Sequence, residues 1–167
     1  QAEQTASALL RRIAAQRIKR LSAEIALVEV EIARLIADHP ELAERNAIMR
    51  SVPGVGPTTA ATLLAFMPEL GAMSARQAAS LVGVAPFDCE SGAFRGKRRI
   101  AGGRKPPRDA LYMAALVASR RNTTMAAAYH NLKNAGKPAK VALVAIMRKL
   151  ITALNAMIRN KQKWAAA

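Results

Sequence analysis

The chain has 167 residues, of which 51% are hydrophobic and only 4% are aromatic. This length suits one domain, or one domain with an extended helix, and the abundance of alanine and leucine favours helices over sheets. The formal net charge of +15 points to a polyanionic partner, nucleic acid first and an acidic membrane surface second.

The basic residues are unevenly distributed along the chain. Residues 1–45 carry seven Lys/Arg and seven Asp/Glu, whereas residues 46–167 carry the other 19 basic residues and only four acidic ones. The whole excess of positive charge therefore follows residue 45, and we expect DNA or RNA to bind there.

The cysteine and histidine content argues against a disulfide or a metal site. Cys89 is the single cysteine, and His39 and His130 are far apart in the sequence, so we expect no metal site and no cofactor in this chain. No apolar run approaches the ~20 residues of a membrane span, and no signal peptide is visible. We therefore expect a cytoplasmic protein without membrane contact. Because the sequence starts at Gln1 within a helical pattern, we also expect a fragment of a longer protein.

A long N-terminal helix is predicted to run to about Asp38. Its apolar residues recur at alternating spacings of three and four, which is the a/d seam of a coiled coil. An amphipathic helix packed against its own domain has the same pattern, and both interpretations stay open. We therefore divide the chain into a coiled-coil-like helix, residues 1–38, and a helical domain, residues 39–167. The seam residues are Ile18, Leu21, Ile25, Val28, Ile32 and Leu35.

Proline, glycine and capping residues divide the second part into shorter helices. The pattern predicts a helix that restarts at Glu41, helices over 58–67, 75–82, 107–121 and 122–136, and a long last helix opened by Pro138. Ser74 and Gln77 have the spacing of a capping box, and Gly83 ends that helix. No segment shows strand alternation, so the predicted fold class is all-α. The expected buried face of the last helix comprises Val141, Leu143, Val144, Ile146, Met147, Leu150, Ile151 and Leu154.

The turn "PGVG" resembles that of a helix-hairpin-helix motif, placed here at about residues 45–67. In such a motif the glycines let the backbone approach a DNA phosphate, which the amides of the following helix bind without reading sequence. An ordinary helical turn, in which the glycines serve only the backbone geometry, is the alternative. The residues predicted to contact DNA are Gly54, Val55, Gly56 and Thr58.

A basic, glycine-rich loop is predicted at residues 84–107. A run of charge is usually a solvated surface, but cations on a deformable backbone are also what binding to a phosphate backbone requires. Only Phe87 and Phe94 are interleaved as aromatics, so the loop gives little support for base stacking. The candidate phosphate-binding residues are Arg95, Lys97, Arg98, Arg99, Arg104, Lys105 and Arg108.

Within this loop Ser91 stands directly before Gly92. A serine beside a glycine in a loop is most often a turn residue, and no Ser–His–Asp set follows from the spacing. Asp88 and Glu90 could make local turn bonds as easily as act as bases. Nothing in the sequence indicates a lowered pKa for the Cys89 thiol. From the residues alone, the turn interpretation of Ser91 is therefore favoured.

The order of these motifs resembles one family of bacterial insertion-sequence transposases. The segments "SVPGVGPTTAATLLA", "ASLVGVAPFDCESGAFRGKRRIAGGRKPPRDALYMAALVA" and "YHNLKNAGKPAKVALVAIMRKLITALNAMI" resemble the C-terminal domain of the family related to the pilin-gene invertase Piv. Members of that family use a bridge RNA to select donor and target DNA. The resemblance covers about residues 38–160, and the preceding helix resembles the linking coiled coil of the family.

The resemblance implies a specific chemistry. Ser91 matches the family's nucleophilic serine, whose hydroxyl attacks a DNA phosphate to form a covalent phosphoserine link. Mg²⁺ is then expected on an N-terminal RNase H-like domain absent from this sequence, so the fragment should bind nucleic acid without cutting it. Glu90 departs from the family pattern, which often has a small or polar residue there. Bacterial, nucleoid-associated localisation and a homodimer or homotetramer are expected with this assignment.

Two alternatives remain at this stage. The chain could be a non-enzymatic helix-hairpin-helix module that clamps nucleic acid, or mainly an oligomerisation domain built on its first helix. Only a requirement for Ser91 separates the enzymatic interpretation from the first alternative, because both predict binding to DNA.

Overall fold

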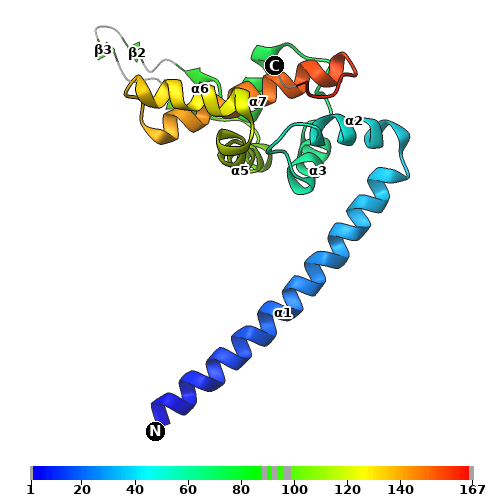
Figure 1. Cartoon of the computed structure of the whole chain (residues 1–167), viewed down its shortest axis with the longest axis vertical. Coiled ribbons are helices and arrows are strands. Elements are labelled where there is room, and N and C mark those ends of the chain that lie inside the picture. The colour runs from blue at the N-terminus through cyan, green and yellow to red at the C-terminus, as the bar shows by residue number, and fades with distance from the viewer. Residues whose placement is uncertain (1, 88–89, 92–93, 96–98, 166–167) are drawn as a thin grey trace. The chain divides into compact units, whose positions relative to one another are not determined.

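The structure is a computed structural model that describes the backbone of residues 2–87, 90–91, 94–95 and 99–165. Side chains are described for all of these except residues 2–6, 90, 91, 94 and 95. Within this description the chain forms seven helices and four strands of two residues each (Figure 1). The predicted all-α class is confirmed. The chain divides into two compact units, Gln1–Pro40 and Glu41–Ala167.

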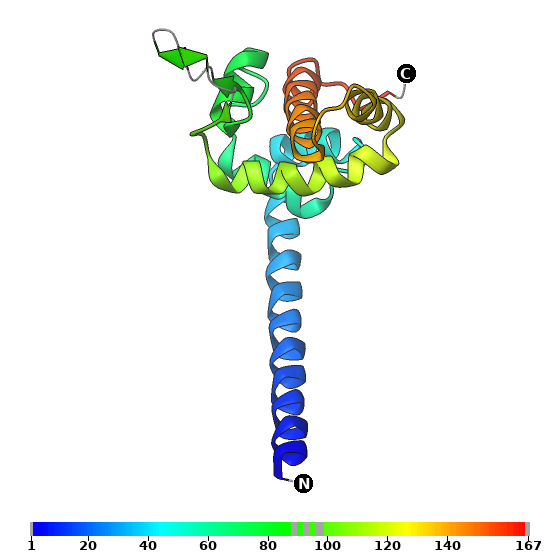
Figure 2. The ribbon, with the colours of Figure 1, turned by 90° about the vertical axis from the view of Figure 1, so that its left-hand side faces the viewer.

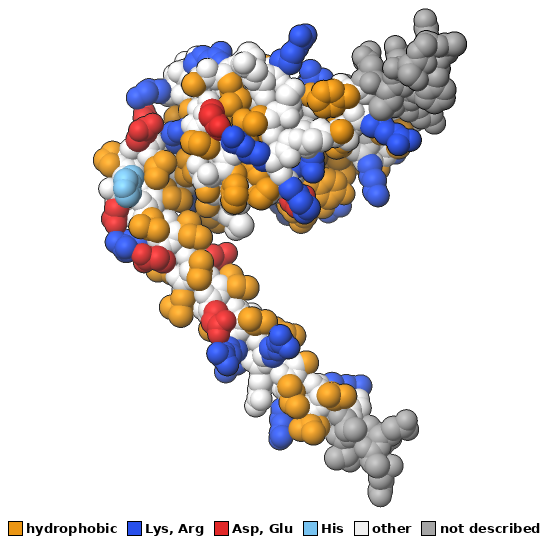
Figure 3. Space-filling view, turned by 180° about the vertical axis from the view of Figure 1, so that it is seen from behind, with side chains coloured by type: hydrophobic (Ala, Val, Ile, Leu, Met, Phe, Trp, Pro, Cys, Tyr) orange, Lys and Arg blue, Asp and Glu red, His pale blue; other side chains and the backbone are white. Residues whose placement is uncertain are grey.

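The first unit consists mainly of the helix α1, Ala2–Ala37. All six seam residues are exposed, from 39% for Ile32 to 65% for Ile18. Figure 3 shows hydrophobic and charged side chains alternating along this helix. The apolar residues of the seam are therefore exposed along α1.

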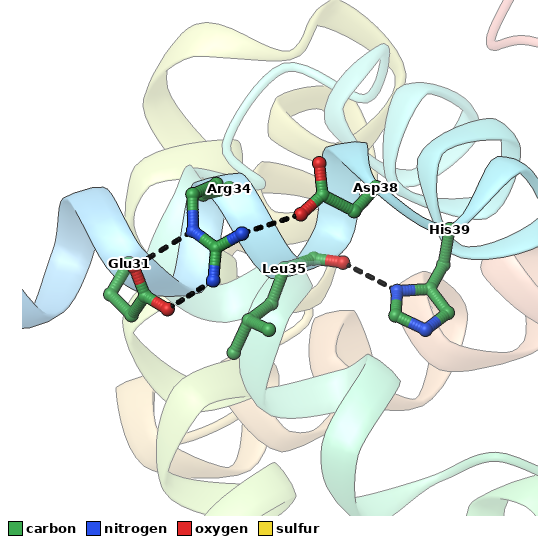
Figure 4. A network of polar contacts seen from close by, with 5 residues as sticks. All are labelled: Glu31, Arg34, Leu35, Asp38 and His39. Carbon is green, nitrogen blue, oxygen red and sulfur yellow. Dashed lines mark hydrogen bonds and ion pairs between the residues drawn. The ribbon is translucent and has the colours of Figure 1, made fainter.

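A network of polar contacts stabilises the end of α1 (Figure 4). Arg34 donates hydrogen bonds to both carboxylate oxygens of Glu31, at 2.6 and 3.0 Å, and to Asp38 at 2.7 Å. The guanidinium of Arg34 lowers the pKa of Glu31. Nδ1 of His39 lies 2.8 Å from the carbonyl oxygen of Leu35, so this nitrogen is the protonated one. The histidine donor thus satisfies a carbonyl of the last turn, where the positive charge of Arg34 also lies.

The second unit contains the shorter helices of the predicted series. Helix α3 begins at Pro57 with Gly56 as its N-cap, and α4 has the complete Ser74–Gln77 capping box and ends at Gly83, as predicted. The start of α3 and the ends of α4 follow from residues next to those ends in the sequence. The helices are α2 (Pro40–Arg50), α3 (Pro57–Phe66), α4 (Ala75–Val82), α5 (Lys105–Arg121), α6 (Thr123–Asn134) and α7 (Ala139–Arg159).

Helix α7 forms the centre of this unit. It packs against α4, α5 and α6, and α5 packs in turn against α3 and α6 (Figure 2). Six of its eight predicted core residues are buried, whereas Val144 is half-buried and Val141 is 53% exposed. The prediction for Val141 is therefore wrong, because this side chain lines a groove on the surface and does not face the core.

The apolar composition of α7 corrects the expectation that no apolar segment approaches the length of a membrane span. By length and composition alone this helix could cross a membrane, since an 18-residue window has a mean hydropathy of 1.8. Half of that window is buried inside the unit. Burial against three other helices accounts for the hydropathy of α7.

A buried asparagine ties α7 to the link between α3 and α4. Asn155 is 2% exposed, accepts a hydrogen bond from the amide of Gly71 and donates one to the carbonyl of Met73, each at 2.8 Å. Arg159 also donates to the carbonyls of both Gly71 and Met73. These bonds satisfy polar groups that would otherwise be costly to bury, so they fix the link on the end of α7.

The turn between α2 and α3 is held by close backbone packing. Gly54 has a φ of +108°, and a Cβ placed on it would lie 2.8 Å from both the amide nitrogen and the Cβ of Ala118 in α5. At Gly56 a Cβ would meet no heavy atom within 4 Å, and φ has an ordinary value of −85°. The two glycines of the turn therefore have different roles in the fold.

This difference predicts unequal effects for the same substitution at the two positions. Gly54→Ala should destabilise the chain by roughly 1–3 kcal/mol, because both the backbone angle and the contact with Ala118 forbid a side chain. Gly56→Ala should lower the midpoint of thermal unfolding much less, because it changes only the N-cap of α3 and its Cβ meets no neighbouring atom. Circular dichroism melts of both variants test this, and an equal loss of stability in both would contradict it.

Candidate nucleic-acid interface

The two ends of the basic loop are brought together at a contact between glycine backbones. A Cβ on Gly83 would lie 2.2 Å from the carbonyl oxygen of Gly102, and a Cβ on Gly103 would lie 2.3 Å from the amide nitrogen of Gly83. The amide of Arg104 also donates to the carbonyl of Leu81 at 2.8 Å. Only residues without side chains permit this approach, so the loop leaves and re-enters the helical unit at nearly one point.

Above this contact the loop forms two short antiparallel ladders. Strand β1 (Pro86–Phe87) pairs with β4 (Arg99–Ile100), and β2 (Glu90–Ser91) pairs with β3 (Phe94–Arg95) (Figure 1). The prediction that this segment has no strands is wrong. Two-residue strands are too short to show the alternation by which a strand is recognised in sequence.

Ser91 lies in the outer ladder, where it is opposite Phe94. The backbone of Arg95 pairs with Glu90 in the same ladder. The side chains of Ser91 and Arg95 lie outside the described part of the structure, as do Lys97 and Arg98 altogether. Their assigned roles therefore remain predictions.

Arg104 lies at the base of the loop and is engaged within the protein. Its guanidinium donates to both oxygens of Glu69, at 2.7 and 2.9 Å, and to the carbonyl of Phe66 at 2.6 Å. This bidentate pair lowers the pKa of Glu69 from its ordinary value of 4.5 to about 2, chiefly through the hydrogen bond from Arg104. Helix α3 is thereby joined to the start of α5. Its predicted phosphate contact stays a prediction, and its charge is balanced by Glu69.

The other described cations of the loop differ in how they are held. Lys105 pairs with Asp109 one turn along α5, and Arg108 donates to the carbonyl of Gly102. Arg99 is exposed at the end of the inner ladder. The structure therefore brings Arg99 and Arg108 to one side of the loop base.

The residues of the turn predicted to contact DNA differ in exposure, since Val55 is buried and Thr58 is exposed. Val55 as a whole is only 5% exposed, and its amide donates to the carbonyl of Val52 at 2.9 Å, so this residue has little surface to offer a ligand. Thr58 is exposed, and no side chain caps the amides at the start of α3. The first amides of a helix without such a cap can bind an anion.

A groove of about 1000 Å³ opens beside the inner ladder, and sequence reasoning did not identify it. Its lining comes mainly from four elements, β1, β4, α5 and α7. Figure 2 shows how these elements are arranged in the second unit. The lining residues are far apart in sequence, and the spacing of Val141 in the last helix gave no sign that this valine faces a groove. The apolar lining includes Val84, Pro86, Ile100, Tyr112, Val141 and Val144, and the cations are Arg99, Arg108, Lys137, Lys140 and Arg148.

The described residues contain no group of three or more histidine, cysteine or acidic side chains that could hold a metal ion. Two of the four acids after residue 45, Glu69 and Asp109, are already paired with basic side chains. Among the side chains that the structure describes, the donor set therefore does not fit Mg²⁺.

Comparison with known proteins places this geometry in a family context. The family model described as "Transposase IS116/IS110/IS902 family" matches residues 46–130, which include the turn, the loop and Ser91. The pilin gene-inverting protein of Moraxella bovis is 33% identical over 149 residues, covering 87% of this chain. The 42 kDa protein of insertion element IS900 from Mycobacterium paratuberculosis is 31% identical over 160 residues, covering 89% of it.

A protein of insertion element IS110 from Streptomyces coelicolor is also similar, at 29% identity over 135 residues and 80% of this chain. The matches cover 46%, 39% and 32% of the Moraxella, Mycobacterium and Streptomyces proteins respectively. The chain thus spans under half the length of the curated relatives it matches.

The Arg104–Glu69 pair predicts a specific pH dependence of stability. Because the pKa of Glu69 is lowered in the folded state, its contribution is present above pH 4.5 and is lost as the pH falls towards about 2. Glu69→Gln should therefore unfold at a lower temperature than the wild type at pH 7, with the difference shrinking between pH 4.5 and 2. Asp109→Asn, at an exposed pair, is the matched control and should show little change. A difference independent of pH would contradict the assignment.

Proposed function

This chain belongs to the IS116/IS110/IS902 family of transposases, and from that membership we propose that it is the serine-bearing part of a DNA transposase or site-specific recombinase. Ser91 is the proposed nucleophile. The observation that carries the proposal is the position of Ser91 on a short hairpin within the segment that matches the family model. A DNA-inverting protein among the relatives agrees with DNA as the substrate.

The proposed chemistry is an exchange of phosphodiester bonds. The Ser91 oxygen forms a bond to a DNA phosphorus while the bond from that phosphorus to one deoxyribose oxygen breaks. The serine hydroxyl loses a proton and the departing deoxyribose oxygen gains one. The total charge is therefore unchanged, and no oxidant is required. A second DNA hydroxyl then displaces the serine by the reverse step. The phosphoserine link keeps the bond energy of the DNA backbone without ATP.

The base of the loop supports this role by limiting where the hairpin can go. The backbone contact between Gly83 and Gly103 and the β1–β4 pair hold both ends of the loop on the helical unit. Arg99 lies at the end of this ladder and is exposed. A serine delivered from a fixed base has fewer positions to search for a phosphate, which lowers the entropic part of the barrier.

We infer a role for Mg²⁺ from the family resemblance and not from the residues of this chain. When bound, it would supply charge stabilisation to the leaving oxygen. Since the described residues do not fit it, we assign it to a part of the full-length protein outside this sequence. The fragment is accordingly proposed to bind DNA, and a guide RNA by resemblance, without completing recombination. A cytoplasmic, nucleoid-associated location follows from this role.

A second candidate function is a non-enzymatic clamp on nucleic acid. The uncapped start of α3 and the open space at Gly56 favour it, since both leave room for a phosphate at the helix amides. In the proposed recombinase the same turn, resembling a helix-hairpin-helix, positions DNA through Gly54, Val55, Gly56 and Thr58. The two functions share their binding surfaces and differ only in the need for Ser91.

We also propose that α1 joins two or more copies of the protein. Its seam residues are exposed and have the alternating spacing of a coiled coil. A second copy of the same helix presents a complementary apolar stripe, and burying both stripes removes apolar surface from water.

The nucleophile is tested by trapping the covalent intermediate. Full-length protein incubated with nicked DNA, Mg²⁺ and its RNA should give a protein–DNA adduct on a peptide that contains Ser91, detected by mass spectrometry after denaturation. Ser91→Ala should abolish the adduct, whereas Ser80→Ala, at an exposed serine of α4, should not. Normal recombination by Ser91→Ala would place the nucleophile at another residue and leave this chain with the role of a clamp.

The coiled coil is tested with two matched pairs of substitutions in α1. Ile25→Glu with Val28→Glu changes the seam, whereas Leu27→Glu with Val30→Glu changes equally apolar residues outside it that are 72% and 69% exposed. Sedimentation of the 167-residue chain should show dissociation for the first pair only, because charge at a and d positions opposes burial. Equal behaviour of both pairs would contradict a seam at these positions.

A further inference from the structure

We propose that the groove between the inner ladder and α7 holds unpaired nucleotides of the DNA strand, with bases against its apolar lining and phosphates on its basic rim. This inference rests on the proposed function, because it takes DNA as the substrate. It adds a binding surface and a substrate form, since a base can enter a groove only when it is outside the helical stack.

The lining of the groove suits a flat, apolar ring. Val84 contributes to the lining with 1% of its surface exposed, while Tyr112 and Val141 are 38% and 53% exposed. Exposed apolar side chains gathered in one concave place are uncommon on a surface unless they contact a ligand. Tyr112 is the aromatic residue of the lining, and an aromatic ring is what base stacking requires. It comes from α5, outside the loop, and therefore adds an aromatic that the loop sequence did not offer.

The rim selects an anion. Five basic side chains border the groove, from the ladder, α5, the turn before α7 and α7 itself. The single acid among the lining residues is Asp109, and Lys105 is paired with it. Lys137, Lys140 and Arg148 are exposed, and they meet the edge of an apolar surface. A matching partner has flat apolar rings and regularly spaced negative charges. A nucleic acid strand has both, in its bases and its phosphates.

The size and shape of the groove favour a single strand over a duplex. A volume of about 1000 Å³ lies at the upper end of the roughly 300–1,000 Å³ that encloses a small organic ligand. The groove can therefore take more than one base, but in a duplex the base faces are stacked on one another and cannot reach Tyr112.

The position of the groove connects it to the reaction. Pro86 and Ile100 line it and are paired in the inner ladder. The same chain continues from β1 to β2, which contains Ser91. Nucleotides held in the groove would thus be next to the strand segment that the hairpin contacts. Unpaired nucleotides are what strand exchange must produce, so the groove would hold a strand that has left its partner.

The inference is tested by fluorescence anisotropy of the 167-residue chain with three probes. These are an oligothymidylate of about 12 nucleotides, an abasic strand with the same phosphates, and a duplex of equal length. The oligothymidylate should bind about fivefold or more tightly than the abasic strand. Tyr112→Ala should remove most of that difference without changing the binding of the abasic strand.

A charge substitution provides the matched control. Val141→Glu places a carboxylate at the mouth of the groove, whereas Val117→Glu makes the same change at a valine of α5 that is 45% exposed and does not line the groove. Both variants are checked for folding by circular dichroism. Val141→Glu should weaken single-strand binding at least fivefold relative to Val117→Glu and should affect the duplex no more than that control does.

The outcomes separate this inference from the proposed function. If the duplex binds normally but Tyr112→Ala and Val141→Glu behave like the wild type, the groove does not hold bases and the inference alone fails. It also fails if the abasic strand, or polyglutamate of equal charge, displaces oligothymidylate as well as unlabelled oligothymidylate does, because the groove would then be a cationic surface or a site for an acidic protein. If no form of DNA binds, the proposed function fails with it.

Discussion

The contact between the backbones of Gly83 and Gly103 is the constraint on which the candidate site depends. It closes the basic loop at its base, and Arg104 fixes the closure by joining Glu69 and the carbonyl of Phe66. Because the ends are held together, the chain between them can form a hairpin and still return to start α5. The inner ladder that follows this closure, β1 with β4, contributes residues to the groove, so the hairpin and the groove depend on the same support.

Local chemistry made most of the helical framework predictable from the sequence. Pro57 after Gly56, the Ser74–Gln77 capping box and Pro138 each specify a helix end through groups that lie within one turn of it. The all-α class followed for the same reason, since alanine and leucine need no distant partner to favour a helix. These features depend on neighbours in sequence, which a single sequence displays.

Features formed by distant residues were not predictable in this way. Val141 has the spacing of a core residue in α7, and only its position opposite α5 and β4 shows that it faces a groove. Arg104 looks like one more cation of a basic loop, whereas its guanidinium is committed to Glu69, 35 residues earlier. In both cases the residue type and the element could be read from the sequence, and tertiary contact decided the role.

The net charge of the chain is only a partial guide to binding, because some of its basic side chains are paired with acids. Among the described residues, Arg104 and Lys105 are paired with acids, while Lys137, Lys140 and Arg148 are exposed along the groove. Only cations without a carboxylate partner can exchange their counterions for phosphates, so the loop sequence overstates the contribution of its own C-terminal end. The positive surface available to a nucleic acid therefore lies partly on α7, which the basic loop did not suggest. A strand bound as we propose would follow these charges past the inner ladder, which lines the same groove.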